Sequence, residues 1–455
     1  RLMSNTSENL TEALTTFICD TSVTWPTEVT DAVKQTLLGY SAAAAYGWKD
    51  PVWQNIQKGI ALRSHVGPHW CVGLKDRLEI RDAVFLNAVA GNAQDFDDTH
   101  VPTIIHPSSV ILPVVMALAQ ERESTAAEII KSILMGYEVT CRLGNAVHPE
   151  HYQKGYHITA TCGVVGAAVS AALLMKLNQS QMRNAIAIAA GQASGLIENL
   201  ASQAKAFAVG AAARDGILAA EFAQQGLTGP ADPIGGKYGF LRVLCAEPNL
   251  TRLVENLGEY WQILQVTYKP YPVGVVLNPV IEGALALRRD SNIQINEINV
   301  IEVRGHELLL KRADRPAPEN PIDARLSTQH TVAAAMVQGF ITGASFDVDT
   351  LAHPEVKQLR DKIKLTRDDG LDVESAAITV TLQSGEQHVN TTIKGLGSLA
   401  KPMQTKDLAD KLRLALSGSD VDRRVSSLIE KAAGLDTDPL AHNFGQTIVQ
   451  TISNQ

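Results

Sequence analysis

The 455-residue chain has few aromatic residues (5%), five cysteines, no long apolar run and no excess of basic charge. Lysine and arginine number 40 against 48 acidic residues, which gives a formal net charge of −8. Since no block of like charge could follow a phosphate backbone, we expect no nucleic acid partner. The cysteines are scattered without C-x-x-C spacing, which predicts reduced thiols and excludes a disulfide framework and a zinc knuckle.

The chain also lacks a stretch that could cross a membrane. Its most apolar segment, residues 162–175, is rich in alanine, valine and glycine and stops at Lys176. Because a spanning helix needs about 20 apolar residues, we expect no association with a membrane. The first twenty residues have no basic-then-apolar arrangement of a secretory signal, so we expect a cytoplasmic protein.

What the chain does contain is enough apolar sequence, 45% of its residues, for a large core in two or three domains. Residues 7–265 show helical periodicity. The sequences Thr125-Ala-Ala-Glu128 and Asn178-Gln-Ser-Gln181 each place a capping residue three positions before Glu or Gln, which predicts capping boxes that open long helices. The small residues that follow Ile158 predict close helix packing.

The pattern changes after the proline-rich residues 268–272. Residues 298–303 and 377–382 alternate with period two, and Ser384-Gly385 stands where 387–393 would return as a hairpin strand. Helical character resumes at residue 405. We therefore predict a mainly α fold, with a large all-helical domain (residues 1–266 and 402–455) and a smaller α+β domain (residues 267–401).

The densest polar cluster is Asp95-Phe-Asp97-Asp98-Thr99-His100, followed by His106-Pro-Ser-Ser. It follows a helix predicted over residues 81–93, so the carboxylates would gather at the negative end of the helix dipole. Repulsion there would raise a carboxyl pKa and make a proton carrier; the alternative is a solvated loop with aspartates as turn formers. An Asp-Asp-x-x-Asp magnesium motif fails because position 102 is proline, and the EF-hand pattern is also missing.

Two further polar groups stand at predicted helix starts. Gly155-Tyr156-His157 precedes the small-residue helix, where the positive helix end favours a neutral imidazole; a capping or core histidine is the alternative. Ser202-Gln-Ala-Lys205 precedes an apolar helix over residues 206–222. If Ser202 caps that helix, Lys205 occupies the position where a capping box has Glu, and the helix start would attract anions.

The last two groups lie at and beyond the change to mixed structure. Lys269-Pro-Tyr271-Pro holds the backbone extended, as an active-site segment or an interdomain hinge would require. In residues 324–330, Arg325 is suited to bind a carboxylate and His330 to exchange protons, unless both face solvent. The glycine-rich residues 229–239 match neither phosphate-binding motif and predict a structural turn.

Taken in order, these segments resemble the MmgE/PrpD family, which includes 2-methylcitrate dehydratase, cis-aconitate decarboxylase and iminodisuccinate epimerase. The resemblance covers nearly the whole chain. It implies a homodimer in which the α+β domain is a lid, with the active site in the cleft beside it and no metal or organic cofactor. The resemblance and the patterns above give a predicted site with catalytic residues Asp95, His106, His157, Lys205, Lys269 and His330, and substrate-binding residues Thr99, Tyr271, Arg325 and Ser327.

The chain departs from the pattern of the dehydratase and decarboxylase at several positions. It lacks a cysteine shortly after Tyr271-Pro272, Arg325-Leu326 stands in place of Lys-Phe, and one extra residue lies between Thr99 and His106. Asn278 stands in place of a histidine, and His330 replaces a tyrosine, which adds an imidazole able to exchange protons near neutral pH. We therefore predict an epimerase or isomerase of a small di- or polycarboxylate, with His157 or Lys205 paired against His106, His330 or Lys269. A hydro-lyase of the 2-methylcitrate dehydratase type or a cis-aconitate-type decarboxylase is the alternative, and a helical scaffold without activity is the non-enzyme alternative.

Overall fold

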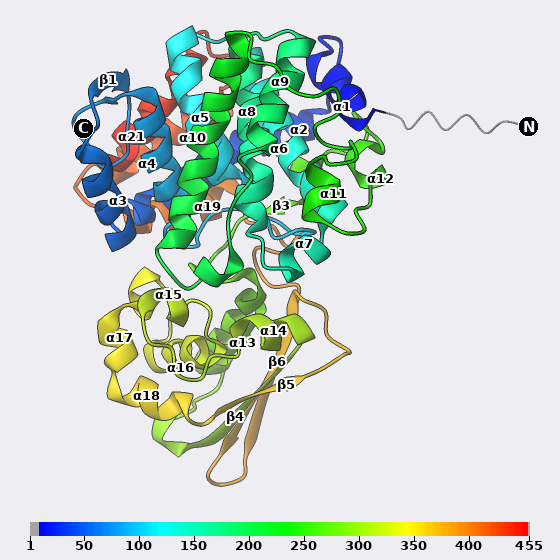
Figure 1. The fold of residues 1–455 in the computed structure, drawn as a ribbon. Helices are drawn as coiled ribbons and strands as arrows, with labels where there is room; N and C mark the ends of the chain where they lie inside the picture. The colour runs from blue at the N-terminus through cyan, green and yellow to red at the C-terminus, as the bar shows by residue number, and fades with distance from the viewer. Residues whose placement is uncertain (1–8, 454–455) are drawn as a thin grey trace, which may run out of the picture. The chain divides into compact units, whose positions relative to one another are not determined.

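The computed structural model describes residues 9–453 and divides the chain into two units, each with its own core (Figure 1). Unit 1 comprises Arg1–Ala93, Asp97–Val266 and Leu408–Gln455, of which residues 1–8 and 454–455 are outside the described part; unit 2 comprises Gln94–Phe96 and Thr267–Asp407. Most residues are helical and the strands are few, so the predicted mainly α fold with a smaller α+β part is confirmed.

Unit 1 is built from helices, and the strands in the segments between them are short. Its helices are α1 (Leu10–Cys19), α2 (Thr27–Gly47), α3 (Pro51–Ala61), α4 (Ile80–Asn92), α5 (Pro107–Arg122), α6 (Ala126–Val147), α7 (Glu150–Gln153), α8 (Ile158–Leu174), α9 (Gln179–Ala190), α10 (Ala204–Gln224), α11 (Phe240–Leu244), α12 (Thr251–Val254), α20 (Val421–Ala433) and α21 (Phe444–Ser453), with α19 (Thr405–Ala415) at the junction of the units. Its strands are β1 (Val66–His69) and β2 (Thr99–His100), and β3 (Val266–Thr267) at the junction pairs with β2.

The apolar helix α8 is the centre of unit 1 and packs against α5, α6, α9 and α10 (Figure 1). Small residues permit these close contacts: a Cβ on Gly166 would lie 1.9 Å from Thr140 Oγ1, and one on Gly216 would lie 2.3 Å from the Ala167 Cβ. Both predicted capping boxes, at Thr125–Glu128 and Asn178–Gln181, are present and begin α6 and α9.

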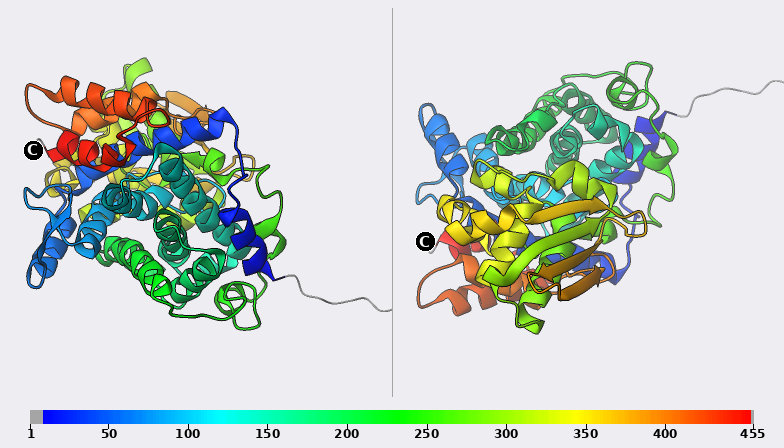
Figure 2. Two further views of the ribbon diagram at one scale, coloured as in Figure 1. Left: turned by 90° about the horizontal axis from the view of Figure 1, so that it is seen from above. Right: turned by 90° about the horizontal axis from the view of Figure 1, so that it is seen from below.

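The C-terminal helices belong to the same core as the N-terminal ones. Helices α20 and α21 pack against α2, and α21 also contacts α5 (Figure 2). Their apolar faces are fully buried, as at Leu428, Ile448 and Val449. Segments some 400 positions apart in the sequence therefore complete one hydrophobic core.

Unit 2 is a four-stranded sheet in the order β5-β4-β6-β7, packed against helices α13 and α16. Its strands are β4 (Ile298–Gly305), β5 (Ile363–Arg367), β6 (Ser375–Leu382) and β7 (Gln387–Ile393); its helices are α13 (Asn278–Asp290), α14 (Glu307–Ala313), α15 (Pro321–Ala324), α16 (Thr328–Gln338), α17 (Val348–Ala352) and α18 (Pro354–Arg360). The predicted strands and the hairpin turn, where Gly385 has φ +88°, are confirmed. Alternating residues such as Ile301, Val303, Ile378 and Val380 form its core.

The described residues contain no helix that is long and apolar enough to cross a membrane. All five cysteines lie within the described residues and are free thiols.

Candidate functional site

The segment between α4 and α5 makes a tight return that brings His106 beside Asp98. Asp95 has a left-handed backbone (φ +53°), and β2 follows. The backbone N–H groups of Thr103 and Ile104 donate to the His100 carbonyl, and the His100 N–H donates to the Ile105 carbonyl at 2.8 Å. This turn places the last loop residue, His106, at the N-cap of α5.

Two carboxylates of this loop, Asp97 and Asp98, are fully buried at the start of α5. Asp98 Oδ1 accepts from the backbone N–H and the hydroxyl of Ser108 at 3.0 and 2.7 Å, and Asp98 Oδ2 accepts from the Tyr137 hydroxyl at 2.7 Å. Asp97 Oδ2 accepts from Ser109 Oγ at 2.6 Å and from Asn92 Nδ2 at 2.8 Å. The alternative of a solvated loop is therefore wrong.

The carboxylates follow the C-terminal end of α4, where the negative end of the helix dipole repels them. This repulsion is offset because the same carboxylates lie at the N-terminal end of α5, where the dipole is positive. Asp98 takes the place of a capping side chain there, since His106 makes no side-chain cap. Burial still raises the pKa of Asp98 to about 6, and the Asp97 charge adds to this, while the hydrogen bonds from Ser108 and Tyr137 oppose it. A raised carboxyl pKa in this cluster, predicted from repulsion, is thus present but is caused mainly by desolvation.

His106 is buried and its tautomer follows from its partners. Nδ1 lies 2.8 Å from the Asp98 backbone carbonyl, which can only accept, so Nδ1 carries a hydrogen and the lone pair of the neutral imidazole lies on Nε2. Thr99 Oγ1 is 3.3 Å from the same nitrogen. The His106 backbone N–H donates to Thr159 Oγ1 of α8 at 3.1 Å, which fixes the start of α5 against the central helix.

His157 is the N-cap of α8 and is also buried, but its side chain makes no cap hydrogen bond, so the capping alternative is wrong. A short antiparallel bridge holds its segment: Tyr156 pairs with Leu196, and the His157 N–H donates to the Gly195 carbonyl at 3.0 Å. The Tyr156 ring stacks on the imidazole of His151 at a centroid distance of 4.4 Å. This bridge connects the His157 segment to the segment that leads to Lys205.

Lys205 is the second residue of α10 and is partly buried. The predicted cap was wrong: Gln203 is the N-cap, and the Ser202 hydroxyl donates instead to the Asn199 carbonyl at 2.9 Å. Helix α10 begins at Ala204, two residues before the predicted start at Ala206. Lys205 still lies at a positive helix end, where anions are favoured.

In unit 2, Lys269 is almost fully buried, with 1% of its side chain exposed. Its Nζ lies 3.0 Å from both the Asp95 carboxylate and the Asp95 backbone carbonyl. Residues 94–96 belong to unit 2 together with Lys269, an assignment that no sequence pattern indicated. The structure therefore joins two of the predicted catalytic residues in one ion pair.

The remaining predicted residues of unit 2 have local partners. The Tyr271 hydroxyl donates to Glu282 Oε1 at 3.1 Å, and burial raises its pKa. Ser327 is the N-cap of α16, where its Oγ accepts from the His330 backbone N–H and donates to the Arg315 carbonyl. The Ser327 hydroxyl thus has a structural role in this structure. Arg325 is 5% exposed, so the solvent-facing alternative is wrong for it.

His330 is fully buried, and its Nε2 lies 2.8 Å from the Ser345 backbone carbonyl. Burial lowers the pKa of His330 to about 4, although the bond to the Ser345 carbonyl opposes this. The expectation that this imidazole exchanges protons near neutral pH is therefore wrong, because the sequence does not show how deeply the start of α16 is buried. At pH 7 His330 is neutral.

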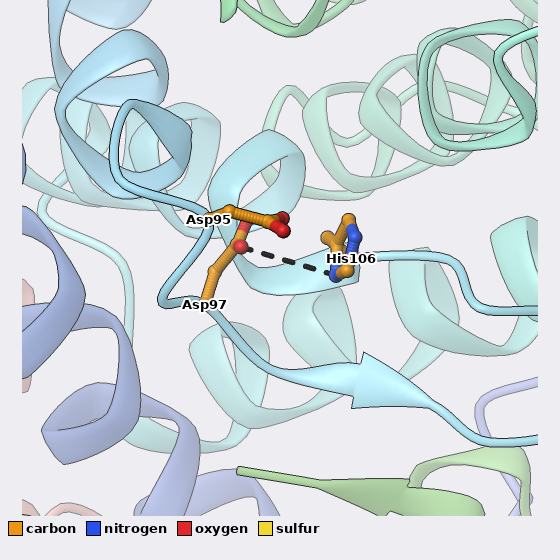
Figure 3. Close-up of side chains that lie close together, drawn as sticks. All are labelled: Asp95, Asp97 and His106. Carbon is orange, nitrogen blue, oxygen red and sulfur yellow. Dashed lines mark ion pairs between the residues drawn. The ribbon is translucent and has the colours of Figure 1, made fainter. Parts of the chain in front are cut away.

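Asp95, Asp97 and His106 each offer one possible metal-ligand atom, and these atoms lie within 4.8 Å of one another (Figure 3). The Asp97 carboxylate is 3.8 Å from His106 Nδ1. However, the Lys269 ammonium already neutralises Asp95, and His106 Nδ1 is occupied by the Asp98 carbonyl. The expectation of chemistry without a metal stays a prediction.

The predicted site residues did not include Asp98 and Tyr137. Asp98 belongs to the acidic segment, but nothing in the sequence distinguished its side chain from those of Asp95 and Asp97. Tyr137 had no signal, because it lies within the helix α6 and 39 positions from its partner.

The fold and these side chains define a class: mainly helical proteins with a small α+β unit, buried histidines at the starts of helices, and lysines at a helix start and in a loop. The chain belongs to the MmgE/PrpD family, since the MmgE/PrpD N-terminal domain matches residues 12–253 and the MmgE/PrpD C-terminal domain matches residues 271–434. The predicted resemblance is thereby confirmed.

Curated relatives of this chain include enzymes of small carboxylates. The chain is 29% identical to cis-aconitate decarboxylase of Homo sapiens over 377 residues, which is 79% of this chain and 77% of the relative. It is 25% identical to cis-aconitate decarboxylase of Aspergillus terreus over 442 residues, 90% of each chain. It is 25% identical to 2-methylcitrate dehydratase of Cupriavidus necator over 292 residues, 59% of this chain and 58% of the relative.

Proposed function

We propose that this protein is an enzyme without a cofactor that removes and returns a proton at a carbon next to a carboxylate of a small polycarboxylate. The observation that carries the proposal is the Asp98 backbone carbonyl 2.8 Å from His106 Nδ1, because a hydrogen on Nδ1 leaves Nε2 as the proton acceptor of the neutral imidazole. A neutral imidazole of this kind is a general base suited to neutral pH. Membership of the MmgE/PrpD family supports the substrate class.

The C–H bond beside a carboxylate is weakly acidic, so its removal requires nearby positive charge as well as a base. In an acidic protein this charge has to be local. We assign it to Lys205 in unit 1 and to Lys269 and Arg325 in unit 2, of which the last two are buried. Thr99 and Asp95 then orient His106 and Lys269 respectively, as their contacts support.

For the finer reaction we propose epimerisation, similar to that of iminodisuccinate epimerase. Two proton carriers on opposite faces of one carbon invert its configuration, and the pairs are His157 or Lys205 against His106 or Lys269. His330 is no longer among the carriers, since its pKa is about 4. We also propose a homodimer in the cytoplasm.

A lyase is the second candidate. The relatives named cis-aconitate decarboxylase and 2-methylcitrate dehydratase favour it. In a dehydration the same proton removal is followed by loss of hydroxide as water, and an alkene is formed instead of an inverted centre. In a decarboxylation the bond to CO₂ breaks, and a proton carrier of the site delivers a proton to the carbon skeleton, which takes up the electron pair that CO₂ leaves.

Incubation of the protein with a panel of di- and tricarboxylates in D₂O separates these reactions. We expect solvent deuterium to enter an unchanged carbon skeleton, observed by NMR, if the reaction is epimerisation. An alkene absorbing in the ultraviolet indicates dehydration, and released CO₂ indicates decarboxylation. A folded protein that does none of these on the whole panel contradicts the proposal.

The variant His106→Gln tests the assignment of the base, and we expect a loss of about a hundredfold or more in kcat. His100→Gln is the matched control. His100 is a fully buried imidazole of the same loop, with bonds to Thr103 and Gln262, and it has no role in the proposed reaction. An equal loss in both variants contradicts a specific role for His106.

A further inference from the structure

Asp98 makes two kinds of contact. Its backbone carbonyl contacts His106, and its side-chain carboxylate contacts helices α5 and α6. Its carbonyl accepts from His106 Nδ1, while its carboxylate accepts from Ser108 of α5 and Tyr137 of α6. We propose that Asp98 and Tyr137 are positioning residues that keep His106 in the Nδ1–H tautomer and so present Nε2 as the base. This inference rests on the proposed function, in which His106 removes the substrate proton.

The geometry explains how a side chain controls a carbonyl. Both oxygens of the Asp98 carboxylate are held, Oδ1 by two donors from Ser108 and Oδ2 by one from Tyr137, at 2.7 to 3.0 Å. Because carboxylate and carbonyl belong to one residue, fixing the side chain restricts the rotation of its peptide group. His106 and Ser108 both lie at the start of α5, so the helix start sets the distance between the imidazole and the Asp98 carbonyl.

The chemical consequence concerns which ring nitrogen can accept a proton. The two neutral tautomers of imidazole are exchanged by loss of the proton from one nitrogen and gain of a proton at the other, and the hydrogen bond at one nitrogen selects between them. A mobile Asp98 carbonyl would weaken that selection, and a fraction of His106 would then carry its hydrogen on Nε2. Such molecules cannot remove the substrate proton through Nε2.

The network also connects the base to pH. The titratable groups facing Asp98 are Asp97 and His106 of the same loop, and Tyr137 and Cys141 of α6. The ionised Asp98 carboxylate accepts hydrogen bonds from all three of its donors, the Ser108 N–H, the Ser108 hydroxyl and the Tyr137 hydroxyl. A protonated Asp98 carboxyl carries a hydrogen of its own, which faces these donors and disrupts the network. Since the Tyr137 hydrogen bond lowers the pKa of Asp98, its removal raises that pKa and moves the acid limb of activity to higher pH.

The test is the full-length variant Tyr137→Phe, which removes one hydroxyl and keeps the ring. We expect kcat to fall about tenfold with KM unchanged, as is usual for the loss of a partner behind a catalytic group, and the acid limb to move to higher pH. Nitrogen-15 NMR of the labelled histidines should show the His106 hydrogen shared between Nδ1 and Nε2 in the variant and confined to Nδ1 in the unmodified protein.

Tyr40→Phe is the matched control, because Tyr40 is a fully buried tyrosine of unit 1 whose hydroxyl donates to the Asn87 carbonyl at 2.8 Å. We expect it to lose similar stability and to leave both the pH profile and the His106 spectrum unchanged. Ser108→Ala removes a second donor to Asp98 and should change the spectrum in the same direction as Tyr137→Phe. This second variant keeps the test valid if Tyr137→Phe does not fold.

The outcomes for the two proposals are distinguishable. An unmodified protein that is inactive on the carboxylate panel contradicts the proposed function, and the NMR spectrum still tests the tautomer. A Tyr137→Phe variant with the His106 hydrogen confined to Nδ1 and an unmoved acid limb overturns the positioning role. The positioning role is also overturned if the control variant Tyr40→Phe reproduces every effect of Tyr137→Phe.

Discussion

At the scale of single residues, burial decides the charge of the groups in this protein. It raises the pKa of Asp98 to about 6 and lowers the pKa of His330 to about 4, so each shift favours the neutral form. The two shifts affect stability in opposite directions with pH. Lys269, in contrast, is a buried lysine with a carboxylate partner at 3.0 Å.

The His330 shift predicts a pH dependence of folding. Its folded pKa of about 4 is below the ordinary value of 6.5, so the unfolded chain binds more protons between these values and stability falls as pH decreases through this window. His330→Gln preserves a donor to the Ser345 carbonyl and removes the titration. We expect the difference in free energy of unfolding between the two proteins, measured with urea, to change by about 3 kcal/mol between pH 7 and pH 4. A difference that is constant with pH contradicts this.

The Lys269–Asp95 pair predicts both a catalytic and a structural effect. Lys269→Met leaves the Asp95 carboxylate without its ammonium partner, and we expect a loss of about 1–3 kcal/mol in stability and of activity by about a hundredfold. Lys394→Met is the control, since its ammonium pairs with Asp372 and Glu374 and is 36% exposed. Urea unfolding and the deuterium assay measure both, and a Lys269 variant that behaves like the Lys394 variant disproves the assignment.

At the scale of elements, a two-residue bridge joins two helix starts. Residues 155–157 pair with residues 195–197, and this pairing holds the segments before α8 and α10 together. Gly195 makes the close approach possible: it has φ +137°, and an added Cβ would lie 3.1 Å from the Cβ atoms of His157 and Ala160. Only a residue without a side chain fits here without displacing His157.

Gly195→Ala therefore tests the placement of His157. We expect kcat to fall about tenfold or more and stability to fall by about 1–2 kcal/mol, because backbone strain and a steric contact act together. Gly226→Ala has the same kind of positive φ (+95°) but open space around the new Cβ. It should lose stability and keep activity; if it loses as much activity as Gly195→Ala, displacement of His157 is not the cause.

At the scale of the whole molecule, unit 1 is assembled from three separate parts of the sequence. The C-terminal helices bury apolar residues against α2 and α5, which are formed from the first third of the chain. Apolar burial stabilises at about 25 cal/mol per Å², so we expect these helices to contribute substantially to the stability of the unit 1 core.

Removal of residues 405–455 tests this dependence. We expect the shortened protein to lose cooperative unfolding in unit 1 and to bind a fluorescent apolar dye, because the buried faces of α2 and α5 become exposed. Arg423→Ala changes only an exposed residue of α20 and should unfold as the unmodified protein does. A shortened protein that still unfolds cooperatively contradicts the assembly described for unit 1.

Much of the fold was predictable because local patterns determine local structure. The capping residues of α6 and α9, the alternation of β4 and β6 and the turn at Gly385 depend on neighbours within a few positions. The predicted cap of α10 was wrong because the Ser202 hydroxyl donates to the Asn199 carbonyl behind it, and Gln203 is the N-cap. The acidic loop was recognised, but its burial and its contact with α5 were not.

The sequence by itself determined the mainly α fold, the family and the segments that carry the chemistry, because periodicity, capping and motif spacing are properties of the chain. Only the tertiary structure decided the ionisation state of Asp98 and His330 and the position of the hydrogen on His106. Burial of Asp98 and His330, the carbonyl behind His106 and the hydroxyl of Tyr137 depend on residues distant in sequence. Ionisation and tautomer follow from desolvation and hydrogen bonding, which exist only after the chain has packed.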